Sequence, residues 1–460
     1  MWPNTASLVV EGTARSMVAR GIDSFSFLVF NSQDPCARPT RVFQQPVRAC
    51  NGELGSGTRW GPLAATLLLA LLGAGCAGDA KGPPALYVDP ANYDFTANPE
   101  LLERIRSNPH GYFRFINIPF SKHVCELFAD RIDEMTSDQR RSYLLNLHGD
   151  AHLELYAVTD LGRGLTDFDD SSAGPPVIDL LRFAVSLRLT SRSNDWDAAT
   201  EEELIRTFLA GYRAALEQPT IVAHEPSVVE GLHSTFTQDT AGYFEWVDSL
   251  MQPMPPALEE ELRLAMIGFA KVAVREHPEV SVEYFEPVRM GYLKLGVGSA
   301  LDTKFLVRIR GPTDDPIDDA VLEVKQVRDL GDVECIEAVE DDPFRILLGQ
   351  ARIAYEPFRW LGYVRLGDNN FWTHAWVQNY RELDVDESFS SPRELVEVAF
   401  DVGVQLGIGH YKMAASPFDE MLRQQNRQRL LEHPNEVSAI SLELADDVLE
   451  AWRWFTAALD

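Results

Sequence analysis

The sequence predicts an α+β fold in which helices form one lobe and a small antiparallel sheet forms another. Between residues 177 and 276, apolar residues recur at the spacing of amphipathic helices. From residue 291 the pattern changes to strand-like alternation, with turns rich in glycine, aspartate and proline. Helical spacing then returns towards the C-terminus. We therefore expect a helical lobe over 98–290, a β-rich lobe over 291–385, and helices over 386–460 that complete the helical lobe.

The composition is that of a folded protein without a basic surface for nucleic acids. Of the 460 residues, 45% are hydrophobic, which excludes disordered and low-complexity classes. The 41 basic and 70 acidic side chains give a formal charge of -29, whereas nonspecific binding to nucleic acid requires basic side chains that release counterions. An anionic ligand must therefore meet a local basic site.

Residues 1–76 are predicted to be an upstream extension followed by a lipoprotein-type signal peptide. Residues 61–75 carry no charge, and this length suits the apolar region of a signal peptide better than a membrane span. The run ends in small residues directly before Cys76, which resembles bacterial lipoprotein signals. This resemblance implies lipidation of Cys76, a tether over 77–97 and a location in the cell envelope. The alternatives are a buried helix or an uncleaved anchor, and a cytoplasmic protein if there is no signal.

Two further cysteines, Cys125 and Cys335, lie in the part predicted to fold. The five cysteines of the chain are too few for a disulfide scaffold. Two alternatives remain open for this pair. One is two buried thiols, and the other is a single disulfide in an oxidising compartment.

Two turns rich in acidic residues follow apolar, strand-like runs in the first lobe. The first turn carries His148, Asp150 and His152, and the second carries Asp167 and Asp169. Carboxylates gathered at one site cannot all stay ionised without a cation or a raised pKa, so a divalent metal ion is a natural partner. The alternative is a pair of Asx turns on solvated loops.

A glycine turn and a lysine mark the β-rich lobe. Gly296, Gly298 and Ser299 lie in a turn between two predicted strands, and Lys325 lies in the next strand. Backbone N–H groups of a turn without side chains can approach phosphates closely, and a strand-borne lysine adds a compact positive charge. The alternatives are an ordinary tight turn and a solvent-exposed lysine.

Together these motifs resemble the catalytic and metal loops of aminoglycoside-phosphotransferase-type kinases. They are more similar still to the bacterial domain-of-unknown-function 2252 family, which is grouped with the protein-kinase-like fold. The similar segments between residues 100 and 415 include HGDAH at 148–152, DFDD at 167–170, NPHGYFR at 108–114, GVGS at 296–299 and LEVK at 322–325. The resemblance implies a two-lobed, kinase-like fold.

The same resemblance implies roles for individual residues. Asp150 would be the catalytic base for a substrate hydroxyl, and Asp167, helped by Asp169, would bind the Mg²⁺ that bridges the phosphates of ATP. Lys325 would hold the inner phosphates beneath the glycine turn. Structural support for the loops would come from His148, His152, Asp179 and Arg114.

The order of the motifs predicts a circular permutation. In ordinary kinases the glycine turn and the lysine strand precede the catalytic loop, whereas in this chain they follow it. We expect the segment 390–411 to supply the helix that elsewhere leads directly into the catalytic loop. Chain termini often lie near one another at a domain surface, so such a rearrangement is tolerable.

Two positions depart from the kinase pattern. Leu155 stands where phosphotransferases have an asparagine that binds a second metal ion, and an apolar side chain cannot bind Mg²⁺. The acidic partner of Lys325 is not apparent, with Glu337, Glu340 and Glu356 as candidates.

Three functions therefore remain open. The first is an ATP- and Mg²⁺-dependent phosphotransferase acting on a small-molecule hydroxyl. The second is a catalytically weak or inactive kinase-like binding lipoprotein. The third is a metal-dependent hydrolase built on His148, Asp150, His152 and Asp167, a histidine and carboxylate set with metal-ligand spacing.

Overall fold

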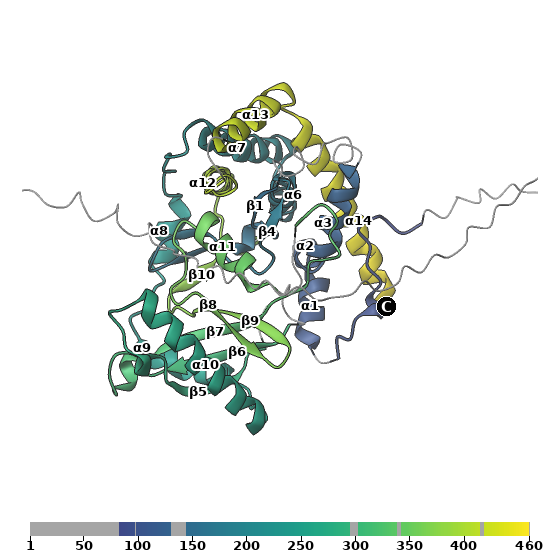
Figure 1. The fold of residues 1–460 in the computed structure, drawn as a ribbon. Helices are drawn as coiled ribbons and strands as arrows, with labels where there is room; N and C mark the ends of the chain where they lie inside the picture. Colours follow the sequence, from purple (N-terminus) through teal and green to yellow (C-terminus); the bar gives the residue numbers. More distant parts are fainter. Residues whose placement is uncertain are drawn as a thin grey trace, which may run out of the picture. The chain divides into compact units, whose positions relative to one another are not determined.

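The computed structural model describes residues 82–96, 98–129, 144–294, 302–337, 342–414 and 418–459. All of them belong to one compact unit, Gly78–Asp460. The predicted signal region, Cys76 and the glycine turn with Gly296, Gly298 and Ser299 lie outside the described residues. The predicted α+β class is confirmed (Figure 1). Among the described residues, no helix combines the length and the apolar character needed to cross a membrane.

Three short helices open the described chain, namely α1 (Pro99–Ser107), α2 (Pro109–Phe115) and α3 (Asn117–Leu127). The side chains of Asn98 and Asn108 cap α1 and α2, and a proline follows each of them at the first helical position. Residues 82–96, which belong to the predicted tether, pack against this region instead. Leu86 and Phe95 are buried, because a segment with apolar residues at intervals gains more from the core than from water.

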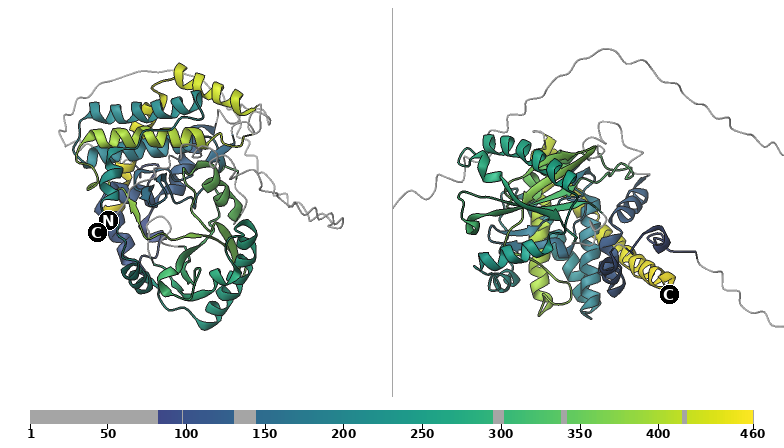
Figure 2. Two further views of the ribbon diagram at one scale, coloured as in Figure 1. Left: turned by 90° about the vertical axis from the view of Figure 1, so that its left-hand side faces the viewer. Right: turned by 90° about the horizontal axis from the view of Figure 1, so that it is seen from below.

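Four long helices form the main core, namely α6 (Val177–Ser193), α7 (Ala198–Glu217), α12 (Pro392–Gly409) and α14 (Glu436–Leu459). Helix α6 is buried along its length from residue 178 to 191. Helices α7 and α12 lie side by side (Figure 2). They approach so closely that a Cβ atom on Gly211 would lie 2.2 Å from the carbonyl oxygen of Phe400. Glycine is therefore required at this crossing.

Two small antiparallel sheets carry the acidic turns. Strand β1 (Leu145–Leu147) pairs with β4 (Ser172–Gly174), while β2 (Tyr156–Thr159) pairs with both β3 (Arg163–Leu165) and β10 (Tyr380–Glu382). The turn at 148–150 directly follows β1, and the turn at 167–170 lies between β3 and β4. Each acidic turn is thus attached to strands of the two small sheets.

The largest sheet has five antiparallel strands in the order β5 (Pro287–Tyr292), β6 (Lys304–Ile309), β7 (Ala320–Gln326), β9 (Asn369–Ala375) and β8 (Gly362–Leu366). Its two faces differ as the strand alternation dictates. One face carries Phe305, Val307 and Val324 and packs on α10 (Pro256–Glu276). Helix α10 lies within the predicted helical lobe, yet it packs on the sheet, because its apolar stripe with Met266 and Phe269 matches this face.

The remaining elements connect these groups. They are α8 (Ser227–His233), α9 (Thr240–Leu250), α11 (Pro343–Ile353), α13 (Phe418–Glu432) and the 3₁₀ turns Pro90–Asn92, Leu153–Leu155, Val282–Phe285 and Pro316–Asp318. Of the two alternatives for the cysteines, the structure contains the disulfide, which joins Cys125 on α3 to Cys335 ahead of α11.

Candidate functional site

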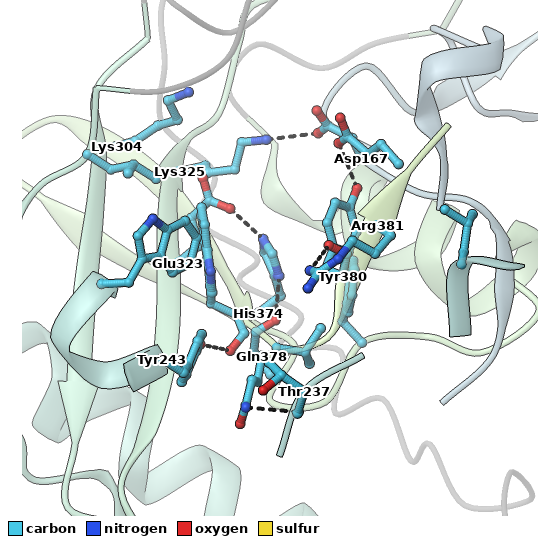
Figure 3. A pocket seen from close by; sticks show the side chains of 18 of the residues that line it. Asp167, Thr237, Tyr243, Lys304, Glu323, Lys325, His374, Gln378, Tyr380 and Arg381 are labelled. Atoms are coloured by element: carbon cyan, nitrogen blue, oxygen red, sulfur yellow. Dashed lines mark hydrogen bonds and ion pairs between the residues drawn. The ribbon is translucent and has the colours of Figure 1, made fainter. Parts of the chain in front are cut away.

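A cavity of about 830 Å³ opens on the face of the five-stranded sheet that α10 does not cover (Figure 3). Side chains of β6, β7 and β9 line one wall, and Asp167 lies on the opposite wall. The segment 376–382, which leads from β9 into β10, lines a third side. Aromatic side chains gather at one end, namely Tyr243, Trp246 and Trp376.

Lys325 joins the sheet to the acidic turn across this cavity. Its Nζ lies 2.8 Å from Asp167 Oδ1 and 2.5 Å from Asp169 Oδ2. The second oxygen of Asp169 accepts a hydrogen bond of 2.7 Å from Trp372 Nε1. The partners of Lys325 are thus the metal-loop carboxylates; Glu337 and Glu356 form no ion pair with it, and Glu340 lies outside the described residues.

The charges of this cluster depend on one another. Burial alone would lower the pKa of Lys325, but Asp167 and Asp169 raise it well above its ordinary value. Burial likewise opposes ionisation of Asp167, yet the adjacent Lys325 lowers the pKa of Asp167. Burial and the neighbouring Asp167 raise the pKa of Asp169 to about 7. The pKa values of the two carboxyl groups in this cluster are therefore shifted in opposite directions.

Asp167 and Asp169 suit a divalent cation by the chemistry of their donor atoms. Mg²⁺ prefers carboxylate oxygens, and the Asp167 side chain is 34% exposed at the cavity. Asp167 also has a backbone φ of 55°, in the left-handed region where aspartate is one of the better tolerated residues. This backbone conformation directs the turn towards the sheet at a cost of order 1–3 kcal/mol, which the surrounding packing must supply.

Asp150 lies in the other turn and is held by a buried arginine. Arg182 of α6 donates from Nε and Nη2 to Asp150 Oδ1, at 2.9 and 2.7 Å. The guanidinium also lies 3.8 Å above the ring of Phe113. Burial outweighs the attraction of Arg182 and raises the pKa of Asp150 to about 7. A carboxyl group with this pKa can accept and release a proton near neutral pH.

The turn around Asp150 is fixed from beneath by Asp179. Its carboxylate accepts hydrogen bonds from the backbone N–H groups of His148 and Gly149, at 2.7 and 2.9 Å, and it contacts His410 Nε2 at 3.0 Å. Gly149 has a φ of 84°, and a Cβ atom there would lie 1.9 Å from the carbonyl oxygen of Asp170. Only glycine fits between the two turns.

His148 connects the two turns through its ring. Its Nε2 donates to the carbonyl oxygen of Thr166 at 2.9 Å, and its Nδ1 accepts from the backbone N–H of Asp150 at 3.3 Å. Burial lowers the pKa of His148, in keeping with a neutral ring. Both ring nitrogens are thus engaged within the turns, so the four-residue hydrolase set with Asp167 does not converge on one point.

A second cluster lies beside Asp150 and consists of His110, His152, Glu154 and Arg114. Donor atoms of the two histidines and Glu154 lie within 4.8 Å of one another, a set that also occurs at zinc sites. However, Glu154 Oε2 already accepts from His110 Nδ1 at 2.8 Å and from Arg114 Nη1 at 3.1 Å. The cationic Arg114 at the same oxygen disfavours a metal ion, so His110, Glu154 and Arg114 are better described as a hydrogen-bonded support. The buried Nδ1 of His152, in contrast, has no hydrogen-bond partner among the described residues.

Several residues of the site were not predicted. Lys304 lies opposite Lys325 in the β6–β7 register, and strand alternation would have placed it on the same face. Glu323 contacts His374 Nε2 at 3.0 Å, and the ring of His374 stacks on Trp372. Arg182 lies among the apolar residues of α6, a helix that also buries Asp179 and Arg188, and could have been recognised as half of a buried ion pair.

Comparison with known proteins relates part of the chain to one family. Residues 99–240 match the model of the family described as "Uncharacterized protein conserved in bacteria (DUF2252)". The match contains both acidic turns and helices α6 and α7 but ends before the sheet with Lys325. The predicted relationship to this family is thus confirmed over these residues. Neither the curated proteins nor the solved structures gave a match.

Proposed function

We propose that this protein is a kinase-like phosphotransferase that binds a nucleotide with Mg²⁺ and acts on a hydroxyl group of a small molecule. One observation carries the proposal. Lys325 and Asp167, 158 residues apart in sequence, meet at 2.8 Å on the wall of a single cavity. Phosphoryl transfer depends mainly on positioning and charge stabilisation, and protein kinases use a lysine on the third strand of the sheet together with an aspartate that binds Mg²⁺. Strand β7 is the third strand of the large sheet in chain order.

The path of the chain supports a permuted kinase-like fold. The end of α12 lies directly beside β1, where the backbone N–H of Asn146 donates to the carbonyl oxygen of His410 at 3.2 Å. The Asn146 side chain donates to the carbonyl oxygen of Gly409 at 2.8 Å. A helix that ends at this point leads in space into the turn with Asp150, as the permutation hypothesis requires.

The residues would divide the work between the cavity and the buried turn with Asp150, because Asp167 and Lys325 line the cavity whereas Asp150 is buried and is not among its lining residues. Asp150 would orient the acceptor hydroxyl and take its proton, since its pKa of about 7 suits a general base. Lys325 would hold the phosphates, and Asp167 with Asp169 would hold Mg²⁺. When bound, Mg²⁺ neutralises phosphate charge. Arg182 and Asp179 would keep the catalytic turn in place.

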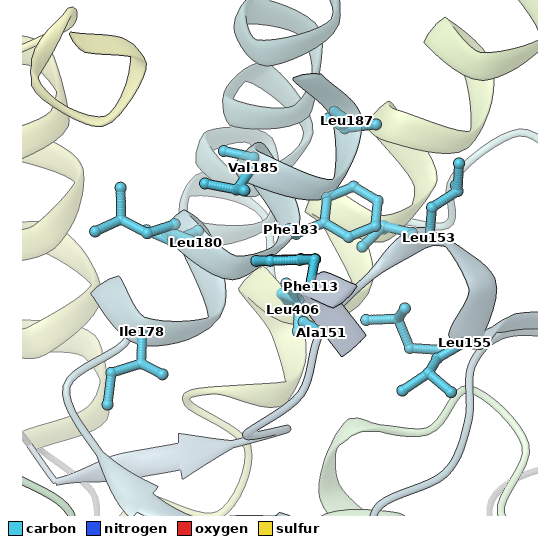
Figure 4. Packing of buried hydrophobic residues seen from close by; sticks show 14 of the residues in the cluster. Phe113, Ala151, Leu153, Leu155, Ile178, Leu180, Phe183, Val185, Leu187 and Leu406 are labelled. Atoms are coloured by element: carbon cyan, nitrogen blue, oxygen red, sulfur yellow. The ribbon is translucent and has the colours of Figure 1, made fainter. Parts of the chain in front are cut away.

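A weakly active or inactive binding protein is the second candidate. Leu155 is buried and belongs to the same apolar cluster as Phe113, Leu153 and Phe183 (Figure 4). It offers no ligand for a second metal ion. The Cys125–Cys335 disulfide favours an oxidising compartment outside the cytoplasm, in keeping with a lipid anchor on Cys76. ATP is scarce in such a compartment. A protein with a kinase-like cleft there would therefore act by binding a ligand rather than by turning over ATP.

A thermal-unfolding titration tests nucleotide binding. A ligand at 100 times its Kd stabilises the folded state by about 2.7 kcal/mol, which shifts the Tm by a few degrees at this size. We expect such a shift with ATP plus Mg²⁺ and its loss in Asp167→Asn and Lys325→Met. Lys271→Met, at an exposed position on α10, is the matched control. The absence of any shift at millimolar nucleotide would refute the proposal.

Asp150→Asn separates the two candidates. This variant should retain the nucleotide-induced shift, because Asp150 lies in the other turn from Asp167, but it should lose phosphorylation of an acceptor or slow hydrolysis of ATP. A wild-type protein that binds ATP but shows no turnover distinct from Asp150→Asn would be the binding protein.

A further inference from the structure

Helix α10 carries apolar side chains on two opposite faces. Its inner face, with Met266 and Phe269, packs on the five-stranded sheet (Figure 1). On its outer face, Leu264, Ile267 and Val272 are 59%, 43% and 55% exposed. A helix that covers a sheet ordinarily has polar residues on the side turned to solvent, and a helix that is apolar on every side is ordinarily buried. The outer face of α10 therefore has the character of an interaction surface.

A glycine lies in the middle of this outer face. Gly268 shares the face with Leu264 and Val272, because helical residues four positions apart lie on the same side. Glycine weakens a helix interior relative to alanine, so its presence there calls for a reason. A Cβ atom on Gly268 would meet nothing within 4 Å, in contrast to Gly211 at the crossing of α7 and α12. The fold itself therefore does not require glycine at position 268, whereas a second helix packed across this face would.

The charged residues of α10 differ in sign between its two ends. Glu260 and Glu261 are exposed near the start of the helix, and Lys271 and Arg275 are exposed near its end. In the last two turns these basic residues outnumber the one acidic residue, Glu276. A second copy of α10 in antiparallel orientation places the acidic end of each helix against the basic end of the other. Because a two-fold axis repeats every contact, the face is complementary to itself.

We propose that the outer face of α10 binds a second copy of this chain, with the two α10 helices antiparallel about a two-fold axis at Gly268. In this register Leu264 lies opposite Val272 of the second copy, and Glu260 lies next to Arg275 of the second copy. An anionic membrane surface suits this face less well, because the acidic end of α10 would meet like charge. An interface of one helix from each copy is small, so we expect a weak dimer with a Kd of roughly 1–100 µM.

Sedimentation velocity of the full chain, over a concentration series that spans this Kd, tests the inference. The wild-type protein should form a dimer. Gly268→Glu and Leu264→Glu should raise the dimer Kd roughly tenfold or more, because each brings carboxylates into the apolar contact. Gly268→Glu should not disturb the fold, since its side chain enters open space. Leu431→Glu, at a 47% exposed leucine of α13, is the matched control and should dimerise like the wild type.

Exchange of charges tests the antiparallel orientation. Glu260→Lys and Arg275→Glu should each raise the dimer Kd roughly threefold or more, because each brings like charges together. The double variant should recover the wild-type Kd, because the pair is restored with its signs reversed. In a parallel arrangement each of these residues would face its own copy, and the double variant would not recover. The absence of recovery would therefore refute the proposed geometry.

Two other results would overturn the inference. One is a wild-type protein that stays monomeric throughout the series, or a dimer that Gly268→Glu and Leu264→Glu leave unchanged. The other is a monomer that binds vesicles of phosphatidylserine and phosphatidylcholine and loses this binding in Leu264→Glu, because the face would then contact a membrane. The nucleotide-induced shift in Tm should be the same in all these variants, since α10 covers the face of the sheet away from the cavity. Failure of the dimer and failure of the proposed function are thus separate results.

Discussion

Replacement of Arg182 by methionine should destabilise the protein in a pH-dependent manner. Arg182 is fully buried, and two of its nitrogen atoms donate to one oxygen of Asp150. Breaking a buried ion pair by removing one partner costs about 3–5 kcal/mol. Asp150 can escape part of this penalty by binding a proton, so the size of the effect depends on pH.

The pKa of Asp150 determines whether Arg182→Met destabilises the protein more at high or at low pH. Burial raises this pKa from 3.8 to about 7 even with Arg182 present, so Asp150 is protonated in the folded protein at pH 5 and ionised at pH 9. The attraction between Arg182 and ionised Asp150 therefore stabilises the folded state above pH 7 and is lost as the pH falls through 7. Since pH 9 lies two units above this pKa, the ionisation of Asp150 can change the free energy of unfolding by at most about 2.7 kcal/mol between pH 7 and pH 9. The variant should thus lose about 2–3 kcal/mol more at pH 9 than at pH 5.

Urea unfolding at both pH values measures this difference, provided that the m-values agree. Arg206→Met, at a 72% exposed side chain on α7, is the control and should change little at either pH. In an Asp150→Asn background, the additional loss at pH 9 should vanish. Equal destabilisation by Arg182→Met at pH 5 and pH 9 would refute the proposed role of this ion pair.

Three further predictions concern the framework of the site. Reduction of the disulfide between Cys125 and Cys335, or replacement of both cysteines by alanine, should lower the free energy of unfolding by about 2–5 kcal/mol. The unfolding temperature should fall accordingly, and an unchanged temperature would mean that the disulfide does not constrain the fold. Gly149→Ala should destabilise by more than about 2 kcal/mol in urea unfolding, because the new Cβ would overlap the carbonyl oxygen of Asp170; a neutral effect would contradict the close approach of the turns. Leu155→Ala should cost about 2–5 kcal/mol by leaving a cavity in the core, while an effect below 1 kcal/mol would indicate a surface position.

These predictions share a physical basis. The two acidic turns are not free loops, because Asp179, His148 and Gly149 bind them to each other and to the core. If the proposed function is correct, this arrangement would hold Asp150 and Asp167 in fixed positions relative to each other. Preorganisation of charged groups is what catalysis of phosphoryl transfer needs most.

The local sequence accounts for much of the site. The acidic turns after apolar strands, the change from helical to alternating periodicity and the lysine on its strand are all visible as patterns. The hypothesis that Asp150, Asp167, Asp169 and Lys325 belong together came from a family resemblance. The periodicity of apolar residues alone could not predict that a residue of β7 contacts a turn that lies much earlier in the sequence.

What the sequence by itself determined is the type and order of the elements, because spacing of apolar residues and turn residues act within a few positions. Only the tertiary structure decided which charges meet. Arg182 faces Asp150, Lys304 opposes Lys325, and α10 packs on the sheet rather than on the other helices. Each of these contacts depends on the register of strands or the rotation of helices that lie far apart in the sequence. Burial of these charged groups then shifts their pKa values.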